Sequence, residues 1–205
     1  MSATSPATSD PPPVRSLSWI GRLPPESPPA SSAGAAVLIV LRELGSGVET
    51  LLIERADRPG DPGSGQVGLP GGHVAASDGS LVDTALREAE EEVGVTAADL
   101  SDRPRYFTTE YASAFRLRVG VFAAALGPGA RRPIARDPAE VAEVYWLPVG
   151  ALNDVRPVLR KTRFGPRTVD AVVHDHHVLW GFTLRVLREF FGVASLPPAQ
   201  SAGPR

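Results

Sequence analysis

The chain of 205 residues contains no cysteine. This absence excludes a disulfide scaffold, a thiolate metal site and a cysteine nucleophile, and it suits a reducing cytoplasm. No apolar run approaches the roughly 18 to 20 residues that a membrane-spanning helix needs. The first residues also lack the basic start and apolar core of a secretory signal. We therefore expect a cytoplasmic protein without a membrane partner.

The chain has little net charge, with a formal value of −2 at pH 7. Arginine supplies nearly all of the positive charge, since Lys161 is the only lysine. A strongly basic nucleic-acid-binding surface is therefore not expected, because such surfaces depend on a large excess of positive charge.

Composition divides the chain into one domain and two tails. Residues 1–33 are dominated by Ser, Pro, Ala and Thr, which bury too little apolar surface to offset the entropy of ordering. We expect a disordered tail there, a domain over 34–193 and a loose end over 194–205. The tail contains a short apolar anchor that could dock on the domain, formed by Leu17, Trp19, Ile20 and Leu23.

Apolar runs between turn signals predict strands, and the first two form a hairpin. The expected strands are 33–43, 50–56, 105–112, 116–126 and 142–149, with a short extended piece over 66–72 and a further strand or extended loop over 155–164. Helical spacing predicts helices over 81–93 and 180–191. This pattern favours an α/β fold, in which helices cover the faces of a mixed sheet.

The helix expected over 81–93 carries an acidic edge. Glu88, Glu91 and Glu92 stand at positions i, i+3 and i+4 and converge beside an apolar stripe, whereas Glu90 points away. Neighbouring carboxylates repel, and a divalent cation would reverse this repulsion. Oxygen-only ligands favour a hard ion such as Mg²⁺ or Mn²⁺. A solvated helical face is the alternative interpretation.

Glycines at both ends of this unit favour a ligand site. The turn that ends in Gly71 and Gly72 lies upstream of the helix, and Gly94 follows its last turn. Glycine at a bend allows the backbone to approach a ligand closely. We therefore expect Gly71, Gly72 and the next residue, His73, to contact the substrate.

These residues resemble the Nudix hydrolase signature. That signature has a glycine, five residues, a glutamate, seven residues, and then Arg-Glu, an aliphatic residue, any residue, Glu-Glu, any residue, Gly and an aliphatic residue. Here Gly72 is followed after five residues by Asp78 in place of glutamate, and eight residues then lead to Arg87. The second half of the signature matches from Arg87 to Val95, with Ala89 as the aliphatic residue.

The resemblance implies a Nudix-type α/β/α sandwich with a mixed β-sheet. It also implies hydrolysis of a diphosphate linked to another moiety, with Mg²⁺ or Mn²⁺ as cofactor. By position, Glu88, Glu91 and Glu92 would be catalytic metal ligands, and Arg87 would orient them through a salt bridge.

A second resemblance concerns the coenzyme A diphosphatase branch of the family. The upstream motif of that branch is matched at Leu51, Leu52, Arg55, Ala56, Gly65 and 70–72. Leu69 stands where that motif has phenylalanine, the loop is one residue longer, and Arg58 is the nearest candidate for the second arginine of the motif. The branch implies cleavage of coenzyme A to 3′,5′-ADP and 4′-phosphopantetheine.

Several residues outside the signature are candidates with open alternatives. Arg55 is either a bidentate phosphate contact or a surface residue at a strand end. Glu140 and Glu143 are an extra ligand or base, or the exposed start of a strand. The run 174–177, His-Asp-His-His, is a metal cluster, a pocket rim or a solvated loop. Alternating side-chain directions in an extended segment argue against three of these residues converging.

We therefore predict a pyrophosphohydrolase with a small nucleotide substrate, coenzyme A or an acyl derivative. The alternative substrates are ADP-ribose, a dinucleotide or a (deoxy)nucleoside triphosphate. A non-catalytic nucleotide sensor on the same fold is the alternative of another class. The sequence leaves open whether the protein is a monomer or a homodimer.

Overall fold

The computed structural model describes residues 17–60, 63–162 and 165–193. Residues 1–16, the first part of the expected N-terminal tail, lie outside the described residues, and so does the expected C-terminal tail, 194–205. Among the described residues, no helix combines the length and the apolar character that crossing a bilayer requires.

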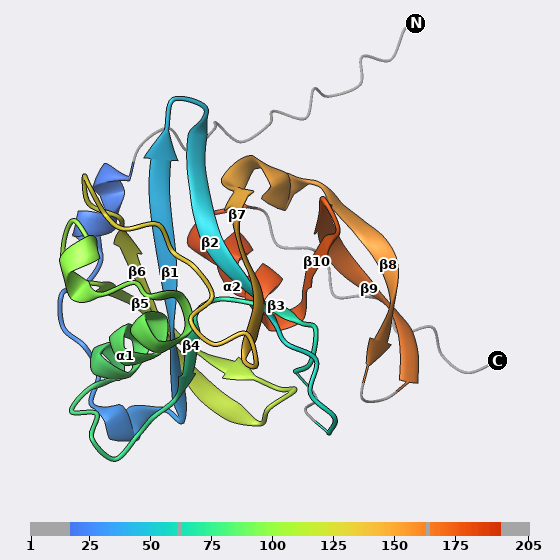
Figure 1. Cartoon of the computed structure of the whole chain (residues 1–205), viewed down its shortest axis with the longest axis horizontal. Coiled ribbons are helices and arrows are strands. Elements are labelled where there is room, and N and C mark those ends of the chain that lie inside the picture. Colours follow the sequence, from blue (N-terminus) through green and yellow to red (C-terminus); the bar gives the residue numbers. More distant parts are fainter. Residues whose placement is uncertain (1–16, 61–62, 163–164, 194–205) are drawn as a thin grey trace, which may run out of the picture.

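The main sheet is mixed and has seven strands (Figure 1). The strands are β1 (Ala35–Leu44), β2 (Gly47–Arg55), β3 (Val67–Gly68), β4 (Gly71–His73), β5 (Arg105–Ala112), β6 (Leu117–Ala125) and β7 (Val141–Pro148). β1 is parallel to β6 and antiparallel to β2 and β4, while β7 is antiparallel to β2. The expected hairpin of the first two strands is confirmed.

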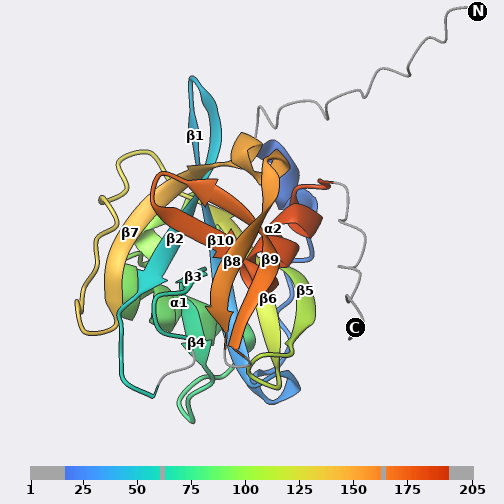
Figure 2. The same cartoon turned by 90° about the vertical axis from the view of Figure 1, so that its right-hand side faces the viewer.

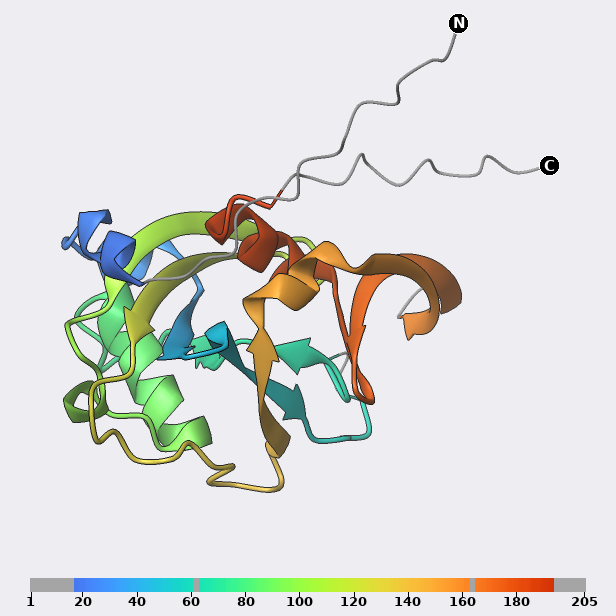
Figure 3. The same cartoon turned by 90° about the horizontal axis from the view of Figure 1, so that it is seen from above.

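Two helices cover opposite faces of this sheet (Figure 3). Helix α1 (Leu81–Val93) packs on one face and helix α2 (Gly181–Phe190) on the other. The apolar run of β1 explains this arrangement, because Leu38 and Val40 face α1 whereas Ile39 and Leu41 face α2. A strand buried on both faces loses the alternation of polar residues, as its sequence shows. The expected α/β/α sandwich with a mixed sheet is confirmed.

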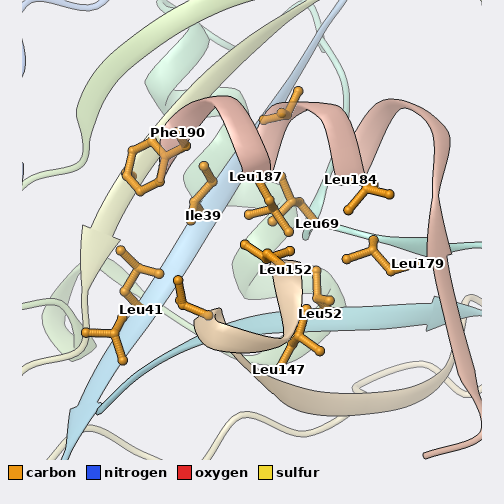
Figure 4. Packing of buried hydrophobic residues seen from close by; sticks show 14 of the residues in the cluster. Ile39, Leu41, Leu52, Leu69, Leu147, Leu152, Leu179, Leu184, Leu187 and Phe190 are labelled. Carbon is orange, nitrogen blue, oxygen red and sulfur yellow. The ribbon is translucent and has the colours of Figure 1, made fainter. Parts of the chain in front are cut away.

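The face below α2 forms a continuous aliphatic core (Figure 4). Leu184, Leu187 and Phe190 of the helix meet Ile39 and Leu52 from the sheet. Burial of each large aliphatic side chain contributes about 1.5–3 kcal/mol. The 3₁₀ helix η4 (Val149–Asn153) contributes to the same core. The other 3₁₀ helices are η1 (Ser18–Arg22), η2 (Ala30–Ser32) and η3 (Ala97–Asp99).

A second, three-stranded sheet lies beside the main one (Figures 1 and 2). It contains β8 (Val155–Thr162), β9 (Gly165–His174) and β10 (His177–Trp180). The strand expected over 155–164 is thus present, whereas the strands within 165–180 are not among those expected from the sequence. The reason is that β9 begins with polar, exposed residues and buries only Ala171 and Val172. Its hydrophobic periodicity is therefore weak.

Residues 17–33 pack on the domain, and the expected disorder of this part of the tail is not what the structure shows. The anchor docks as expected: Ile20 in η1 is buried in the core below α2, and the Trp19 ring lies 4.8 Å from the Phe190 ring. Further along, Ser27 Oγ accepts a hydrogen bond from the N–H of Val82. The segment thus satisfies part of the free N-terminus of α1.

Substitution of the buried anchor residue tests this docking. We expect Ile20→Ala to lower the free energy of unfolding by about 2–5 kcal/mol, because it removes buried methyl groups and leaves a cavity. Arg22→Ala in the same 3₁₀ helix is the matched exposed control and should stay within about 0.5 kcal/mol. Urea denaturation checks both variants. Equal, small effects would show that the segment is not held on the domain.

Candidate active site

Helix α1 presents its acidic edge next to the apolar stripe that the sequence predicts. Val82, Ala85, Ala89 and Val93 are fully buried against the sheet, and the helix ends at Gly94 as expected. Glu88 and Glu92 lie one turn apart beside this stripe. Because the buried stripe fixes the rotation of the helix, it also fixes the direction in which the two carboxylates point.

The double glycine lets the backbone of β4 lie directly against these carboxylates. Gly71 has φ +152°, and a side chain there would collide with the carbonyl oxygen of Ala36. A Cβ atom at Gly72 would lie 2.5 Å from Glu88 Cδ. With no side chain in the way, the Gly71 N–H donates a hydrogen bond to Glu92 Oε2 at 2.9 Å. The expected turn therefore shapes the site through close approach.

Arg87 connects the helix to the preceding loop. Its Nη1 donates to Glu88 Oε1 at 2.8 Å and to Glu91 Oε2 at 3.0 Å. Its Nε and Nη2 donate to the two carboxylate oxygens of Asp78, each at 3.1 Å. Nη2 also donates to the carbonyl oxygen of His73 at 2.9 Å. The guanidinium fork therefore fixes the relative positions of the acidic edge and the glycine turn.

Asp78 is the residue that departs from the Nudix signature, and its carboxylate is committed to Arg87. Its side chain is 4% exposed and also accepts hydrogen bonds from the Ala75 N–H and Thr84 Oγ1, each at 2.8 Å. The hydrogen bonds from Arg87 are the largest cause that holds the Asp78 pKa well below its usual range. The shorter aspartate is thus a buried partner of the arginine.

A cleft of about 200 Å³ opens beside the acidic edge. Its lining joins carboxylates, two arginines and the glycine turn: Arg55, Arg58, Gly71, Gly72, His73, Glu88, Glu92 and Glu140. Arg58 Nη2 lies 3.2 Å from Glu140 Oε1 across the cleft wall. Such a site combines acceptors for a cation with donors for phosphate oxygens.

The residues that the sequence singles out divide into two groups. Arg55, Gly71, Gly72, His73, Glu88 and Glu92 line the cleft, together with Glu140. Glu91 is outside the lining, is 55% exposed and is held by Arg87, which itself lies behind the acidic edge. Spacing along a helix predicts which residues share an edge but not how deeply each one is buried.

Glu143 and part of the histidine run gather elsewhere. His176 and His177 approach Glu143 and Glu54, and Glu54 is not among the candidate residues from the sequence. His174 stays outside this group. Glu54 joins this group because it is paired with Glu143 in the β2–β7 register. A local sequence pattern does not reveal this pairing.

The electrostatics of the cleft favour a bound cation. Burial raises the pKa of Glu92 from 4.5 to about 7, and the nearby carboxylates of Glu88 and Glu140 add to this rise. The Gly71 N–H and Arg55 act in the opposite direction. A divalent cation would favour the ionised form and remove the repulsion. The oxygen-only donors of Glu88 and Glu92 fit a hard divalent ion.

Comparison with known proteins agrees with this geometry. The fold is a mixed sheet between two helices, and its acidic, arginine-lined cleft offers donors and acceptors that suit a divalent cation and phosphate oxygens. The NUDIX domain matches residues 32–169, and the chain belongs to the Nudix family. Members of this family hydrolyse pyrophosphate bonds and generally use divalent metal ions.

Relatives of known sequence and structure carry the same family name. The chain is 32% identical to an uncharacterized Nudix hydrolase NudL of Citrobacter koseri over 161 residues, which cover 76% of this chain and 79% of the relative. NudL of Photorhabdus laumondii is 27% identical over 82% of this chain and 89% of the relative. The crystal structure of a MutT/nudix family protein from Enterococcus faecalis superposes with a TM-score of 0.51 and 21% identity. That match covers 86% of this chain and 67% of the other, and it shows the shared fold.

The raised pKa of Glu92 predicts a pH dependence of stability in metal-free protein. Its folded-state pKa of about 7 lies above the usual 4.5, so its contribution is complete below pH 4.5 and is lost as pH rises through 7. Glu92→Gln does not titrate, so the variant should gain roughly 2–3 kcal/mol relative to wild type between pH 4.5 and 8. Urea unfolding with EDTA measures this difference. A difference that does not change with pH would contradict the raised pKa.

Proposed function

We propose that the chain hydrolyses the pyrophosphate bond of coenzyme A or an acyl-CoA, with Mg²⁺ or Mn²⁺, to 3′,5′-ADP and 4′-phosphopantetheine. One observation carries the proposal: a single cleft brings Glu88, Glu92 and Glu140 together with Arg55 and Arg58. Carboxylates are suited to hard divalent ions, and arginines are suited to phosphate oxygens.

In this proposal, Glu88 and Glu92 hold the cation from the cleft side of α1. Glu91 is the third ligand, since it shares their helical edge and Arg87 orients both Glu88 and Glu91. When bound, divalent ions acidify water and neutralise the charge on the phosphates. Asp78 acts through Arg87 and is a positioning residue, because both of its oxygens accept hydrogen bonds from that side chain.

The arginines of the cleft bind the diphosphate. Arg55 follows the buried part of β2, and Arg58 is oriented by its Nε donating to the carbonyl oxygen of Ala139 at 2.6 Å. The backbone of Gly71 and Gly72 and the His73 side chain form the adjoining wall on which the substrate rests. Bidentate contacts from arginine to phosphate oxygens would set the direction of the bond to be cleaved.

Glu140 is the proposed general base. It lines the cleft together with Glu88 and Glu92 of α1, its Oε1 accepts a hydrogen bond from Arg58 Nη2, and its Oε2 would receive the proton. Glu140 takes a proton from the attacking water, a new P–O bond forms, and the bridging P–O bond breaks. The bridging oxygen leaves with the second phosphate.

The choice of coenzyme A is supported by the resemblance upstream of the signature. Leu51 and Leu52 lie within β2, Arg55 is its last residue and Ala56 follows it, and Arg55 lines the cleft. Arg58, the candidate for the second arginine of that motif, also lines the cleft. Cytoplasmic location stays a prediction from the sequence, and the choice between a monomer and a homodimer stays open.

Neutralising the carboxylates tests the roles assigned to them. We expect Glu88→Gln, Glu92→Gln and Glu140→Gln each to lower kcat on the order of 100-fold or more, the range for loss of a positioned acid or base. Glu90→Gln is the matched control, since Glu90 lies on the same helix, is exposed and stays outside the cleft. Release of product at saturating Mg²⁺ is measured. Near wild-type rates for the three cleft variants would reject the assignment.

A substrate panel tests the identity of the substrate. Coenzyme A, acetyl-CoA, ADP-ribose, a dinucleotide and nucleoside triphosphates are incubated with Mg²⁺ or Mn²⁺, and the products are identified by mass spectrometry. We expect the highest kcat/KM for a coenzyme A compound, with 3′,5′-ADP as product. A higher value for another compound would reassign the substrate. Tight binding with no product from any compound would favour a ligand sensor.

A further inference from the structure

A second group of ligating side chains lies outside the cleft. His177 Nδ1 lies 2.8 Å from Glu54 Oε2, and His176 Nε2 lies 3.0 Å from Glu143 Oε2. His177 Nε2 lies 3.6 Å from Glu143 Oε1, which is beyond hydrogen-bond distance. The two imidazole rings are 4.0 Å apart between centroids. Two imidazoles and two carboxylates are therefore linked by pairwise contacts, and we call these four residues the His–Glu cluster.

Three strands bring the His–Glu cluster together. Glu54 of β2 is paired with Glu143 of β7, so both side chains lie on the sheet face that carries α2. His176 lies in the tight turn between β9 and β10, where Asp175 has φ +52°, and His177 begins β10. The turn delivers two successive residues to the carboxylates, which periodicity in an extended segment would not allow.

The surroundings of the cluster are unusual for a solvated ion pair. His177 is 3% exposed, and its ring stacks on Tyr145 with 3.6 Å between centroids and 4° between planes. Tyr145 Oη is buried without a hydrogen-bond partner in the part of the chain that the structure describes. Two carboxylates that face each other across paired strands repel.

We propose that Glu54, His176 and His177 form a second metal site, selective for a transition-metal ion of the Zn²⁺ type, and that Glu143 orients the two imidazoles from the outer shell. Imidazole nitrogens with carboxylate oxygens suit Zn²⁺, whereas Mg²⁺ prefers oxygen ligands alone. One ligand atom from each of Glu54, His176 and His177 lies within 4.8 Å of the others. Tetrahedral Zn²⁺ with bonds of about 2.0–2.2 Å needs separations of about 3.3–3.6 Å, so small side-chain movements complete the site.

The two metal sites differ in ligand chemistry and in position. No cluster residue lines the cleft, and the cleft lining contains one histidine, His73. The site ties the β9–β10 turn to β2 and β7, and so fixes the second sheet on the first. Glu54 directly precedes Arg55, so the same ion steadies the strand end that carries an arginine of the cleft.

Zn²⁺ binding to the full chain in a large excess of Mg²⁺ tests the proposal. Calorimetry should give one tight Zn²⁺ per chain, and Co²⁺ in its place should give the intense visible absorption of a four-coordinate site. The same stoichiometry should persist in a Glu88→Gln, Glu92→Gln double variant, which removes the acidic edge of α1.

Variants at the exposed residues of the His–Glu cluster show whether Zn²⁺ binds there or elsewhere on the chain. The His176 and Glu143 side chains are 68% and 47% exposed, so His176→Ala and Glu143→Gln should fold, and circular dichroism checks this. His176→Ala should weaken Zn²⁺ binding more than about 100-fold, because it removes a ligand. Glu143→Gln should weaken it about 10- to 100-fold, because it removes the outer-shell partner of the imidazoles. His174→Ala, in the same hairpin but outside the cluster, should stay within about twofold of wild type. Absence of tight Zn²⁺ binding in wild type would overturn the proposal, and so would Zn²⁺ binding that is unchanged in both His176→Ala and Glu143→Gln.

Discussion

The geometry of the site depends on the hydrogen bonds that the Arg87 guanidinium donates. The structure holds carboxylates from α1 and from the preceding loop close together, although their charges repel. The guanidinium group contacts Asp78, Glu88 and Glu91 and also the backbone of the glycine turn at His73. Its planar fork lets one side chain satisfy several acceptors at fixed angles. The acidic edge and the turn are therefore held in one geometry before any ligand binds.

The loop before α1 and the helix itself carry two carboxylates whose pKa values shift in opposite directions. Asp78 is nearly buried but has Arg87 as its partner, which lowers its pKa. Burial raises the pKa of Glu92, the neighbouring carboxylates of Glu88 and Glu140 add to this rise, and the hydrogen bond from the Gly71 N–H offsets it only in part. Carboxylates with divergent environments are a feature of sites that bind ions or transfer protons. This contrast explains why we assign positioning to Asp78 and cation binding to Glu92.

The sequence predicted the elements whose signals are local. The stripe from Val82 to Val93, the end of α1 at Gly94 and the β1–β2 hairpin follow from periodicity and turn residues, and the structure confirms them. It did not predict β9 and β10, because few of their side chains enter the main core. It also did not reveal the packing of residues 24–33, since Ser27 is recognised only through its contact with α1. Prolines and serines signal loops, not where a loop docks.

Within the site, the features that the sequence did not predict also depend on tertiary packing. Helical spacing grouped Glu88, Glu91 and Glu92, but burial separates Glu91 from the other two. Glu140 and Glu143 are both glutamates of the same short segment and look alike in the sequence. In the structure, Glu140 lines the cleft, whereas Glu143 contacts His176 and His177. The bulge in the β2–β7 register, between Glu54 and Arg55, lies where these two environments divide. Such irregularities depend on tertiary packing and have no local signature.

The most direct test of the central claim is anomalous diffraction from crystals soaked with Mn²⁺ and a non-hydrolysable diphosphate analogue. The account predicts an anomalous peak bonded to carboxylate oxygens of Glu88 and Glu92, with the diphosphate against Arg55. A peak away from α1, with both carboxylates free of metal while the analogue is bound elsewhere, would contradict it.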